Sequence, residues 1–312
     1  MTDNTPTSSL DDFDWFKNNG IFMPMINDTA RNVFFKEAIE RACAGKTVVD
    51  IGAGTGLLSV LAARAGAKKV YAVEMDLGRA RFTQNNIRQI GYDNVIEVIN
   101  DNFLNTNISA DIYVSETIGS QIFNENIIAI AEHARKHGGL FIPSKFEITA
   151  TVFEYHPIFN LVQTKSDAFE FQPDIEIHNK FEKHINDTFQ KQHPLSETLY
   201  RANCIDKLFT MLPRFTDLKL KTLHVTNPLT VDLNQMVDIN NLRITIDKKY
   251  CQGHQSVCVV IFWKAYYEDL VMNVTDTWWG NPSKIILPRC RNNALDITTW
   301  YDPTISDWRF SF

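Results

Sequence analysis

The sequence has little glycine, no excess of positive charge and no long apolar run. Only 13 of its 312 residues are glycine, and 31 Lys and Arg stand against 37 Asp and Glu, a formal net charge of −6. Duplex-DNA-binding proteins need a basic surface, so this balance argues against nucleic acid as a partner and favours a small-molecule or cationic substrate. No stretch of ~18 apolar residues is present, so we expect no membrane-spanning helix.

The cysteines are too few and too widely spaced along the sequence to form a disulfide framework. They are odd in number, and none belongs to a Cys-x-x-Cys pair, which argues against structural disulfides and against a metal site. The N-terminal residues carry neither the basic nor the apolar segment of a secretory signal. We therefore expect a cytoplasmic protein with reduced thiols. The five cysteines are Cys43, Cys204, Cys251, Cys258 and Cys290.

The residues that are present fit a folded enzyme of two parts. Hydrophobic residues make up 44% and charged residues 22% of the chain, as in ordinary globular proteins. At roughly 100–200 residues per domain, the length predicts two domains or one domain with a large elaboration. Apolar runs alternate with helical patterns in the first half, which predicts a doubly wound, Rossmann-like parallel sheet. The strands are expected at 47–51, 70–74, 95–99, 111–115 and 139–142, with helices that include 57–65 and 122–136.

The pattern changes after Pro143. Helical periodicity becomes weak, and β-branched and aromatic runs predict a β-barrel or sandwich. We therefore expect an N-terminal segment over 1–20, a cofactor-binding domain over 21–145 and a barrel over 146–312, with the polar stretch 156–200 as an inserted arm. The expected strands of the second half are 146–153, 218–225, 242–247, 257–266, 285–287 and 308–312.

Three of the scarce glycines, Gly52, Gly54 and Gly56, fall within five positions after the first expected strand. Such a turn lets the backbone approach a ligand without side-chain collision. The loop lacks the Gly-Lys-Ser/Thr of triphosphate sites. Asp50, just before it, would repel a pyrophosphate but attract a sulfonium and an amino group. These features favour S-adenosylmethionine over NAD or ATP, although a turn that serves only strand–helix packing is an alternative.

Two further acids follow the next strands. Glu74 stands at the end of the second expected strand, where an acidic residue of dinucleotide-binding folds accepts the ribose hydroxyls. Asp101, or its neighbour Asn102, follows the third strand and can reach the adenine edge; a solvated loop carboxylate is the alternative for Asp101. These two acids complete a predicted cofactor site.

Two segments resemble signatures of the protein arginine methyltransferase family. Residues 25–31, Met-Ile-Asn-Asp-Thr-Ala-Arg, are similar to its N-terminal Met-x-x-Asp-x-x-Arg motif. Residues 115–125 are similar to its double-glutamate loop, Ser-Glu-x-x-Gly with a second Glu nine residues after the first. The resemblance implies that Arg31 clamps the cofactor carboxylate and that Met25 lines the reaction centre. It also implies a ring-like homodimer built by an arm.

The chemistry of the second motif explains why two glutamates are needed. A guanidinium is planar and cationic and carries five N–H donors, so Glu116 and Glu125 can grip it from separate edges and orient one nitrogen toward a methyl group. The sequence therefore predicts N-methylation of a guanidino nitrogen, on arginine in a protein or on free arginine in a specialised pathway. Methylation of an oxygen or carbon nucleophile and a weakly active scaffold that binds the cofactor are the alternatives.

The sequence also departs from the family pattern. The family's Thr-His-Trp loop corresponds to Thr277, Trp278 and Trp279, so a tryptophan replaces the histidine. Residues 12–16 stand where the family has Tyr-Phe-x-x-Tyr, and they contain no tyrosine. We expect Trp278 and Trp279 to line the substrate channel, with an ordinary core role for Trp278 as the alternative. These departures leave the substrate and the number of methyl groups open.

Overall fold

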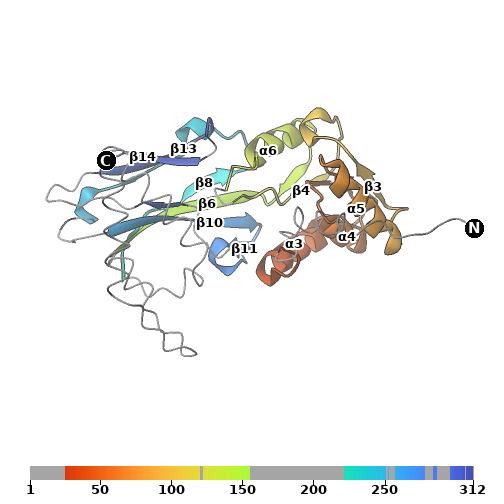
Figure 1. Cartoon of the computed structure of the whole chain (residues 1–312), viewed down its shortest axis with the longest axis horizontal. Coiled ribbons are helices and arrows are strands. Elements are labelled where there is room, and N and C mark those ends of the chain that lie inside the picture. Colours follow the sequence, from red (N-terminus) through yellow and green to blue (C-terminus); the bar gives the residue numbers. More distant parts are fainter. Residues whose placement is uncertain are drawn as a thin grey trace, which may run out of the picture.

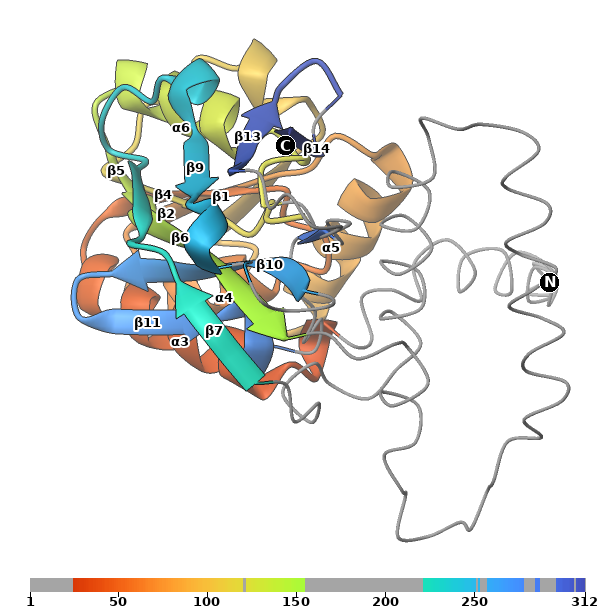
Figure 2. The same cartoon turned by 90° about the vertical axis from the view of Figure 1, so that its left-hand side faces the viewer.

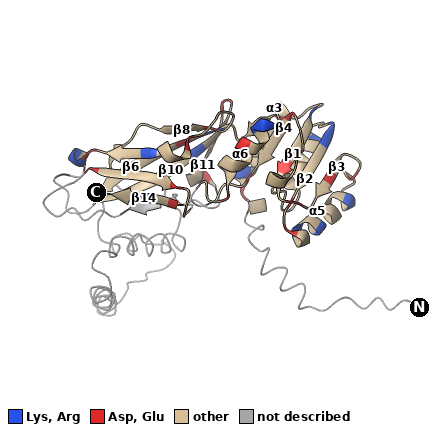
Figure 3. Ribbon diagram, turned by 90° about the horizontal axis from the view of Figure 1, so that it is seen from above, with Lys and Arg blue, Asp and Glu red and all other residues tan. Residues whose placement is uncertain are grey.

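The computed structural model describes residues 25–119, 122–154, 221–250, 252, 257–277, 284–286, 296–305 and 307–311. In this part of the chain a parallel sheet with helices lies at one end, and two antiparallel sheets lie at the other (Figure 1). Acidic and basic residues are interspersed over both ends (Figure 3). No helix of the described part is long and apolar enough to cross a membrane.

The parallel sheet has five strands in the order β3-β2-β1-β4-β5. Strand β1 lies between β2 and β4 and pairs with both in parallel. The residues of β1 and β4 are almost all buried, because helices cover both faces of such a sheet and select continuous apolar runs. The strands are β1 (Thr47–Ile51), β2 (Lys69–Val73), β3 (Ile96–Ile99), β4 (Ile112–Ser115) and β5 (Leu140–Ile142).

Helices cover the two faces of this sheet. The crossovers β1–α4–β2 and β2–α5–β3 step toward one edge and β4–α6–β5 toward the other. Right-handed connections therefore place α6 on the face opposite α4 and α5. Figure 1 shows α6 above the sheet and α3 and α4 below it. The helices are α3 (Thr29–Ala42), α4 (Leu57–Arg64), α5 (Leu77–Gln89) and α6 (Ile127–Lys136), with a 3₁₀ turn, η1 (Phe103–Asn105).

The antiparallel domain is organised around the long strands β6 (Lys145–Glu154) and β10 (Val257–Tyr267), which pair along nearly their whole length. Its larger sheet has the order β11-β10-β6-β7, with β12 on β10 and β8 on β6, and a smaller sheet has the order β14-β13-β9. Figure 2 views this end of the molecule. The other elements are β7 (Lys221–Val225), β8 (Leu229–Asp232), β9 (Arg243–Ile246), β11 (Leu270–Asn273), β12 (Lys284–Ile286), β13 (Ile297–Asp302) and β14 (Asp307–Ser311), with 3₁₀ turns η3 (Ile239–Asn241), η4 (Lys248–Tyr250) and η5 (Val274–Asp276).

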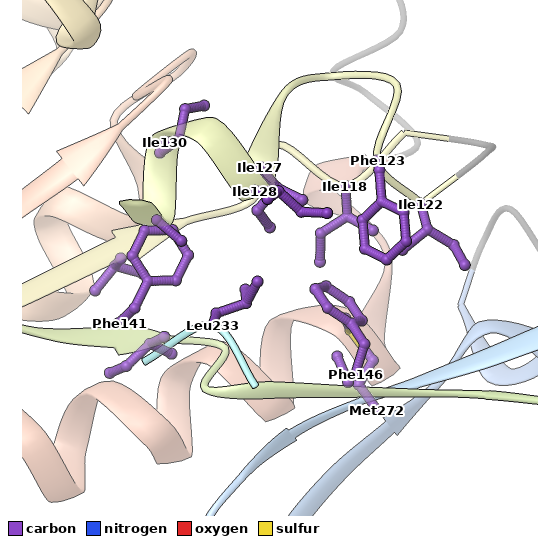
Figure 4. Close-up of a cluster of buried hydrophobic side chains, with 14 of the residues drawn as sticks. Ile118, Ile122, Phe123, Ile127, Ile128, Ile130, Phe141, Phe146, Leu233 and Met272 are labelled. Carbon is purple, nitrogen blue, oxygen red and sulfur yellow. The ribbon is translucent and has the colours of Figure 1, made fainter. Parts of the chain in front are cut away.

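The two domains share one hydrophobic core. Parallel pairing ends with β5 and antiparallel pairing begins with β6, on either side of Pro143. Figure 4 shows where the domains meet: Ile122 and Phe123, from the loop after β4, lie opposite Phe146 of β6 and Met272 of β11. The rings of Phe123 and Phe146 meet edge to face at 5.9 Å between centroids. A continuous cluster of buried side chains runs from the parallel sheet into the antiparallel one.

The predicted fold class, a Rossmann-like domain followed by an antiparallel β domain, is confirmed. One boundary was wrong: the helix expected over 122–136 begins at Ile127, because Ile122 and Asn126 adopt left-handed backbone conformations with φ of 69° and 63°. Strands β8, β11 and β13 were not predicted from the sequence. The N-terminal segment 1–20 and the expected arm over 156–200 lie outside the described residues.

Candidate functional site

A cavity of about 520 Å³ opens at the carboxyl ends of the parallel strands. This edge is where open α/β sheets bind ligands. Every predicted site residue that the structure describes lines it: Met25, Arg31, Asp50, Gly52, Gly54, Glu74, Asp101, Glu116 and Glu125. Among the described residues, the lining therefore carries five carboxylates and two guanidinium groups, those of Arg31 and Arg79. The excess of negative charge favours a cationic ligand.

The glycine loop forms the floor of the cavity between β1 and α4. Gly52 has a φ of +73°, and a Cβ there would lie 3.1 Å from Cγ2 of Thr117. Gly56 has a φ of +83° and caps α4, and a Cβ there would lie 3.1 Å from Cγ2 of Thr83. Both positions thus need the left-handed conformation that glycine adopts without strain. The Thr83 hydroxyl donates a hydrogen bond to the Gly54 carbonyl, which ties the loop to α5.

Asp50 is buried at the end of β1, directly below this loop. It is 1% exposed, and its Oδ2 accepts a hydrogen bond from the hydroxyl of Ser59 on α4 at 2.6 Å. Burial raises the pKa of Asp50 to about 6, and the negative charge of Glu74 adds to this, whereas the Ser59 hydrogen bond and Arg31 act in the opposite direction. A buried carboxylate of this kind gains most from a ligand that brings a positive charge.

Glu74 follows β2 and is held by three donors. Its Oε2 accepts from the backbone N–H of Gly54 at 3.1 Å, and its Oε1 accepts from the backbone N–H of Asp76 at 2.9 Å and from Nε of Arg79 at 3.2 Å. The residue is 4% exposed. The side chain of Asn100 donates to the Glu74 carbonyl at 2.9 Å and fixes the backbone on the other side. The predicted ribose acid is therefore rigidly placed on the cavity wall.

Asp101 lies on the cavity rim, after β3. It is exposed, and its Oδ1 accepts from the backbone N–H of Asn102 at 2.7 Å. The side chain of Asn102, which also lines the cavity, accepts from Leu104 N at 3.0 Å and caps η1. Both residues proposed for the adenine edge thus line the cavity.

Arg31 connects the cofactor side of the cavity with the glutamate side. Its Nη2 donates to Oε2 of Glu116 at 2.7 Å, and both side chains are less than a tenth exposed. Its Nη1 donates to the carbonyl of Met25 at 3.2 Å. The carboxylate of Asp28 caps α3 by accepting from the backbone N–H of Arg31, which fixes the start of the arginine-bearing helix. Arg31 is therefore held beside Glu116 from both its backbone and its guanidinium.

The two glutamates differ in environment. Burial raises the pKa of Glu116, with a smaller contribution from the charge of Glu125, and the Arg31 guanidinium partly offsets this. Glu125 has more exposed surface, since it stands in the loop at the cavity wall, but the surrounding protein atoms reduce its hydration and raise its pKa as well. Glu116 follows β4, and Glu125 precedes α6, so the loop between them decides their spacing.

Some residues that shape the site were not predicted from the sequence, and two predicted site residues lie outside the described part of the chain. Ser59 donates a hydrogen bond to Asp50, and Arg79 donates one to Glu74. Thr117 fills the space beside Gly52. A hydroxyl on a helix or an arginine in a first turn carries no motif, so only their contacts reveal them. Trp278 and Trp279 lie outside the described residues. Among the described residues, no group of three or more His, Cys, Asp or Glu side chains is arranged to hold a metal ion.

The residues fit S-adenosylmethionine. Arg31 lines the cavity, and its buried Nε has no hydrogen-bond partner in the described part of the chain, so the guanidinium keeps donor capacity and a positive charge of the kind that binds a carboxylate. Asp50 presents the opposite charge beneath the glycine loop, and Glu74 and Asp101 lie along the wall. The charges along the cavity therefore match the two parts of S-adenosylmethionine. Arg31 and Asp50 suit its charged amino-acid part, and Glu74 and Asp101 suit its nucleoside.

Comparison with known proteins shows that the parallel domain is similar to methyltransferases. A family model described as ribosomal protein L11 methyltransferase (PrmA) matches residues 33–146. An "Arginine N(omega)-methyltransferase" of Streptomyces achromogenes subsp. streptozoticus is 35% identical over 158 residues, 47% of this chain and 44% of the relative. "Protein arginine N-methyltransferase 1" of Oryza sativa subsp. indica is 31% identical over 169 residues, 51% of this chain and 42% of the relative. The matches thus span less than half the length of these curated relatives.

Solved structures match the whole fold. The crystal structure of PRMT6 has a TM-score of 0.67 at 18% identity and covers 95% of this chain and 99% of that chain. A structure titled "Crystal structure of PRMT6-SAH" has a TM-score of 0.64 at 19% identity and covers 94% and 98%. At these identities the likeness establishes the fold. Together with the sequence matches, it confirms the resemblance to arginine methyltransferases that the two motifs predict.

Proposed function

We propose that the protein is an S-adenosylmethionine-dependent methyltransferase that acts on a guanidino nitrogen of arginine. The observation that carries this proposal is the single cavity that joins the glycine loop and Asp50 to Glu116 and Glu125. Two carboxylates of raised pKa at one wall gain most from a ligand that is itself cationic and planar. The names of the sequence relatives support the same reaction.

Each part of the cofactor has a residue to hold it. When the cofactor is bound, Asp50 would pair with its amino group, the guanidinium of Arg31 with its carboxylate, and Glu74 with its ribose. The backbone of Gly52 and Gly54 would allow close approach, Asp101 would contact the adenine edge, and Met25, which lines the cavity wall, would line the reaction centre. When bound, the cofactor supplies an electrophilic methyl group on its sulfonium sulfur.

The protein contributes position and charge. Glu116, fixed by Arg31, and Glu125, fixed by its loop, grip the guanidinium from two edges and turn one nitrogen toward the methyl group. Glu125 accepts the proton that this nitrogen loses, because its raised pKa makes it a stronger base than a fully hydrated glutamate. The buried surroundings of Glu116 strengthen its attraction for the cation.

A methylation assay tests this function. We expect a labelled methyl group to be transferred from S-adenosylmethionine to at least one of free arginine, an arginine-glycine-rich peptide and histone, with mass spectrometry locating it on a guanidino nitrogen. The separate arms distinguish free from protein-bound arginine. Glu116→Gln should lower kcat a few hundred-fold or more, as expected when one partner of a buried ionic contact is removed, which costs ~3–5 kcal/mol. Glu125→Gln should lower kcat about 100-fold or more, as expected for loss of a general base.

The matched control is Glu37→Gln, on the exposed surface of α3 and away from the cavity, which should retain wild-type activity. The proposal is wrong if the wild-type protein methylates no guanidino nitrogen in any arm, or if Glu116→Gln is as active as the wild type. Product found on an oxygen or carbon atom would likewise overturn it.

We also propose a cytoplasmic homodimer. The resemblance to a family of ring-like dimers supports the dimer, and the acidic composition with scattered cysteines supports the location. Analytical ultracentrifugation at micromolar concentration should give twice the monomer mass of 35.8 kDa, and a monomer at that concentration would contradict the dimer. Cell fractionation tests the location.

A further inference from the structure

Thr117 links the glycine loop to the loop that carries Glu116. It follows Glu116 directly and lines the cavity. Its Oγ1 lies 2.9 Å from Oγ of Ser115, the fully buried last residue of β4, and that serine donates a hydrogen bond to the carbonyl of Ile51 at 3.2 Å. Ser115 and Ile51 are also partners in the pairing of β4 with β1. Two side-chain hydrogen bonds therefore connect the residue after Glu116 to the end of β1, where the glycine loop begins.

The direction of these two hydrogen bonds follows from the number of protons. The Ile51 carbonyl can only accept, so the single hydroxyl proton of Ser115 goes to it. The hydroxyl of Thr117 must then donate to Oγ of Ser115. A bond between the side chains of residues 115 and 117 spans the backbone of the residue between them. It thereby limits the conformations that Glu116 can adopt.

The methyl group of Thr117 meets the glycine loop. A Cβ on Gly52 would lie 3.1 Å from Cγ2 of Thr117, so this methyl group occupies the space that the glycine leaves open. Gly52 is itself held to β2, because its backbone N–H donates to the carbonyl of Val73 at 2.9 Å. Threonine carries both a hydroxyl and a methyl group on Cβ, and their directions are fixed together by one torsion angle. Serine in its place would lose the methyl contact, and valine would lose the hydrogen bond.

We propose that Thr117 is a positioning residue that holds Glu116 at a fixed offset from the glycine loop. Its methyl group abuts the loop that lies beside the methyl donor, and its hydroxyl bond fixes the backbone of Glu116, which binds the guanidinium. Loss of the hydroxyl bond therefore lets the carboxylate shift relative to the methyl donor. Misplacement of a catalytic group by 1 Å costs up to about 100-fold in rate. This inference rests on the proposed function, which assigns Glu116 to the guanidinium and the glycine loop to S-adenosylmethionine.

Steady-state kinetics of Thr117→Val test the hydroxyl bond, because valine keeps the shape of threonine and removes the hydroxyl. The substrates are S-adenosylmethionine and whichever of free arginine, the arginine-glycine-rich peptide and histone the wild type methylates. We expect kcat to fall about 10-fold, as for a displacement smaller than 1 Å, while KM for the arginine substrate and Kd for S-adenosylhomocysteine change by less than about 3-fold. Thr117→Ser keeps the hydroxyl bond and should lower kcat by no more than about 3-fold.

A double-mutant cycle shows whether Thr117 acts through Glu116. Adding Thr117→Val to Glu116→Gln should lower kcat by less than about 2-fold, because no carboxylate remains to be positioned. Thermal melts followed by circular dichroism check that Thr117→Val folds. If it does not, Ser115→Ala takes its place, because it breaks the same bond from the acceptor side and should give the same result.

Thr299→Val is the matched control. Thr299 is fully buried in β13, its hydroxyl donates to the carbonyl of Arg309 at 2.9 Å, and it does not line the cavity. The control variant thus loses a comparable hydroxyl hydrogen bond far from the proposed reaction. It should leave kcat unchanged.

Three results would overturn the assignment. One is a wild-type kcat in Thr117→Val. Another is a 10-fold loss that persists in the Glu116→Gln background, since losses that multiply come from independent effects. The third is a loss of S-adenosylhomocysteine binding in parallel with kcat, which indicates a purely structural role. All three leave the proposed function intact, because the wild type still methylates a guanidino nitrogen. A wild-type protein that methylates no arginine compound would instead contradict the proposed function, and this inference with it.

Discussion

At the scale of single residues, Asp50 shows how the site is maintained at a cost in stability. Its pKa of about 6 lies above the ordinary 3.8, because the folded protein buries the carboxylate. Between these two pH values the folded chain binds more protons than the unfolded chain, so the free energy of unfolding falls as the pH rises. Above pH 6 the full cost of the buried charge, about 3 kcal/mol, is present. A cationic ligand recovers part of it.

Asp50→Asn should therefore separate stability from binding. We expect the stability advantage of the variant over the wild type to grow by about 1.5 kcal/mol as the pH rises from 5 to 7.5, the second half of a total of about 3 kcal/mol that begins to develop near pH 4, because the amide has no charge to bury. Urea titrations at several pH values measure this difference, which isolates Asp50 from the other titrating groups. S-adenosylhomocysteine should bind the wild type more tightly as the pH rises through 6 and bind the variant weakly at every pH. If the stabilities of the wild type and the variant differed by the same amount at every pH, Asp50 would not be the source of the pH dependence.

At the scale of elements, the loop between β4 and α6 sets the distance between the two glutamates. Ile122 has a φ of 69°, a strained value for a β-branched residue, yet its side chain is fully buried. Phe123 beside it packs edge to face on Tyr301 at 5.2 Å between centroids. Burial of these side chains in the core shared by the domains thus holds a backbone that the loop alone would not adopt (Figure 4).

The glycine of this loop has a physical role that the motif does not reveal. A Cβ on Gly119 would lie 1.9 Å from Oδ1 and 2.6 Å from Cγ of Asn124, the neighbour of Glu125. We predict that Gly119→Ala turns the exposed Asn124 side chain aside and lowers kcat by up to about 10-fold through a slight shift of the neighbouring Glu125, because misplacement of a catalytic group by 1 Å costs up to about 100-fold. Adding Asn124→Ala removes the collision and should restore part of the activity. Steady-state kinetics of the two single variants and the double variant decide this, and losses that simply multiply would refute it.

At the scale of the whole molecule, the two domains form one cooperative unit. The buried cluster is continuous across them, and α3, which carries Arg31, packs on both α4 and β11. On the surface, Arg41 near the end of α3 forms ion pairs with Glu268 and Asp269 in the β10–β11 turn. Exposed pairs of this kind contribute ~0–1 kcal/mol, so the apolar core is the main connection.

A common core predicts a common unfolding transition. The helices of the described chain all lie in the parallel domain, whereas its tryptophans, Trp263, Trp300 and Trp308, lie in the antiparallel domain. Far-ultraviolet circular dichroism at 222 nm therefore follows the described α-helices of the parallel domain. Tryptophan fluorescence of a Trp15→Phe variant, which removes the one tryptophan that precedes the parallel domain in the sequence, follows the antiparallel domain. We expect their denaturation midpoints to coincide, as in a two-state transition. Two separated midpoints would show that the domains unfold independently.

Local pattern determined much of the fold. The five parallel strands and the change of architecture after Pro143 follow from apolar runs and their spacing, since buried strands require such runs. The second half was less predictable, because the short strands β8, β11 and β13 depend on pairing with distant partners, and pairing leaves little trace in a single short segment. The start of α6 was missed for a similar reason. Buried contacts of Ile122 and Phe123 override the apolar pattern that continues through them.

By itself the sequence determined which chemical groups the site contains: the glycine loop, the carboxylates after successive strands, and the arginine and paired glutamates of the two motifs. Covalent order and strand period suffice for this, because parallel strands bring their carboxyl ends to one edge. Only the tertiary structure decided how those groups are paired. Arg31 is held on Glu116, Ser59 on Asp50 and Arg79 on Glu74, contacts between residues 85, 9 and 5 positions apart. Such pairings depend on how helices pack against the sheet, and burial then sets their charge states.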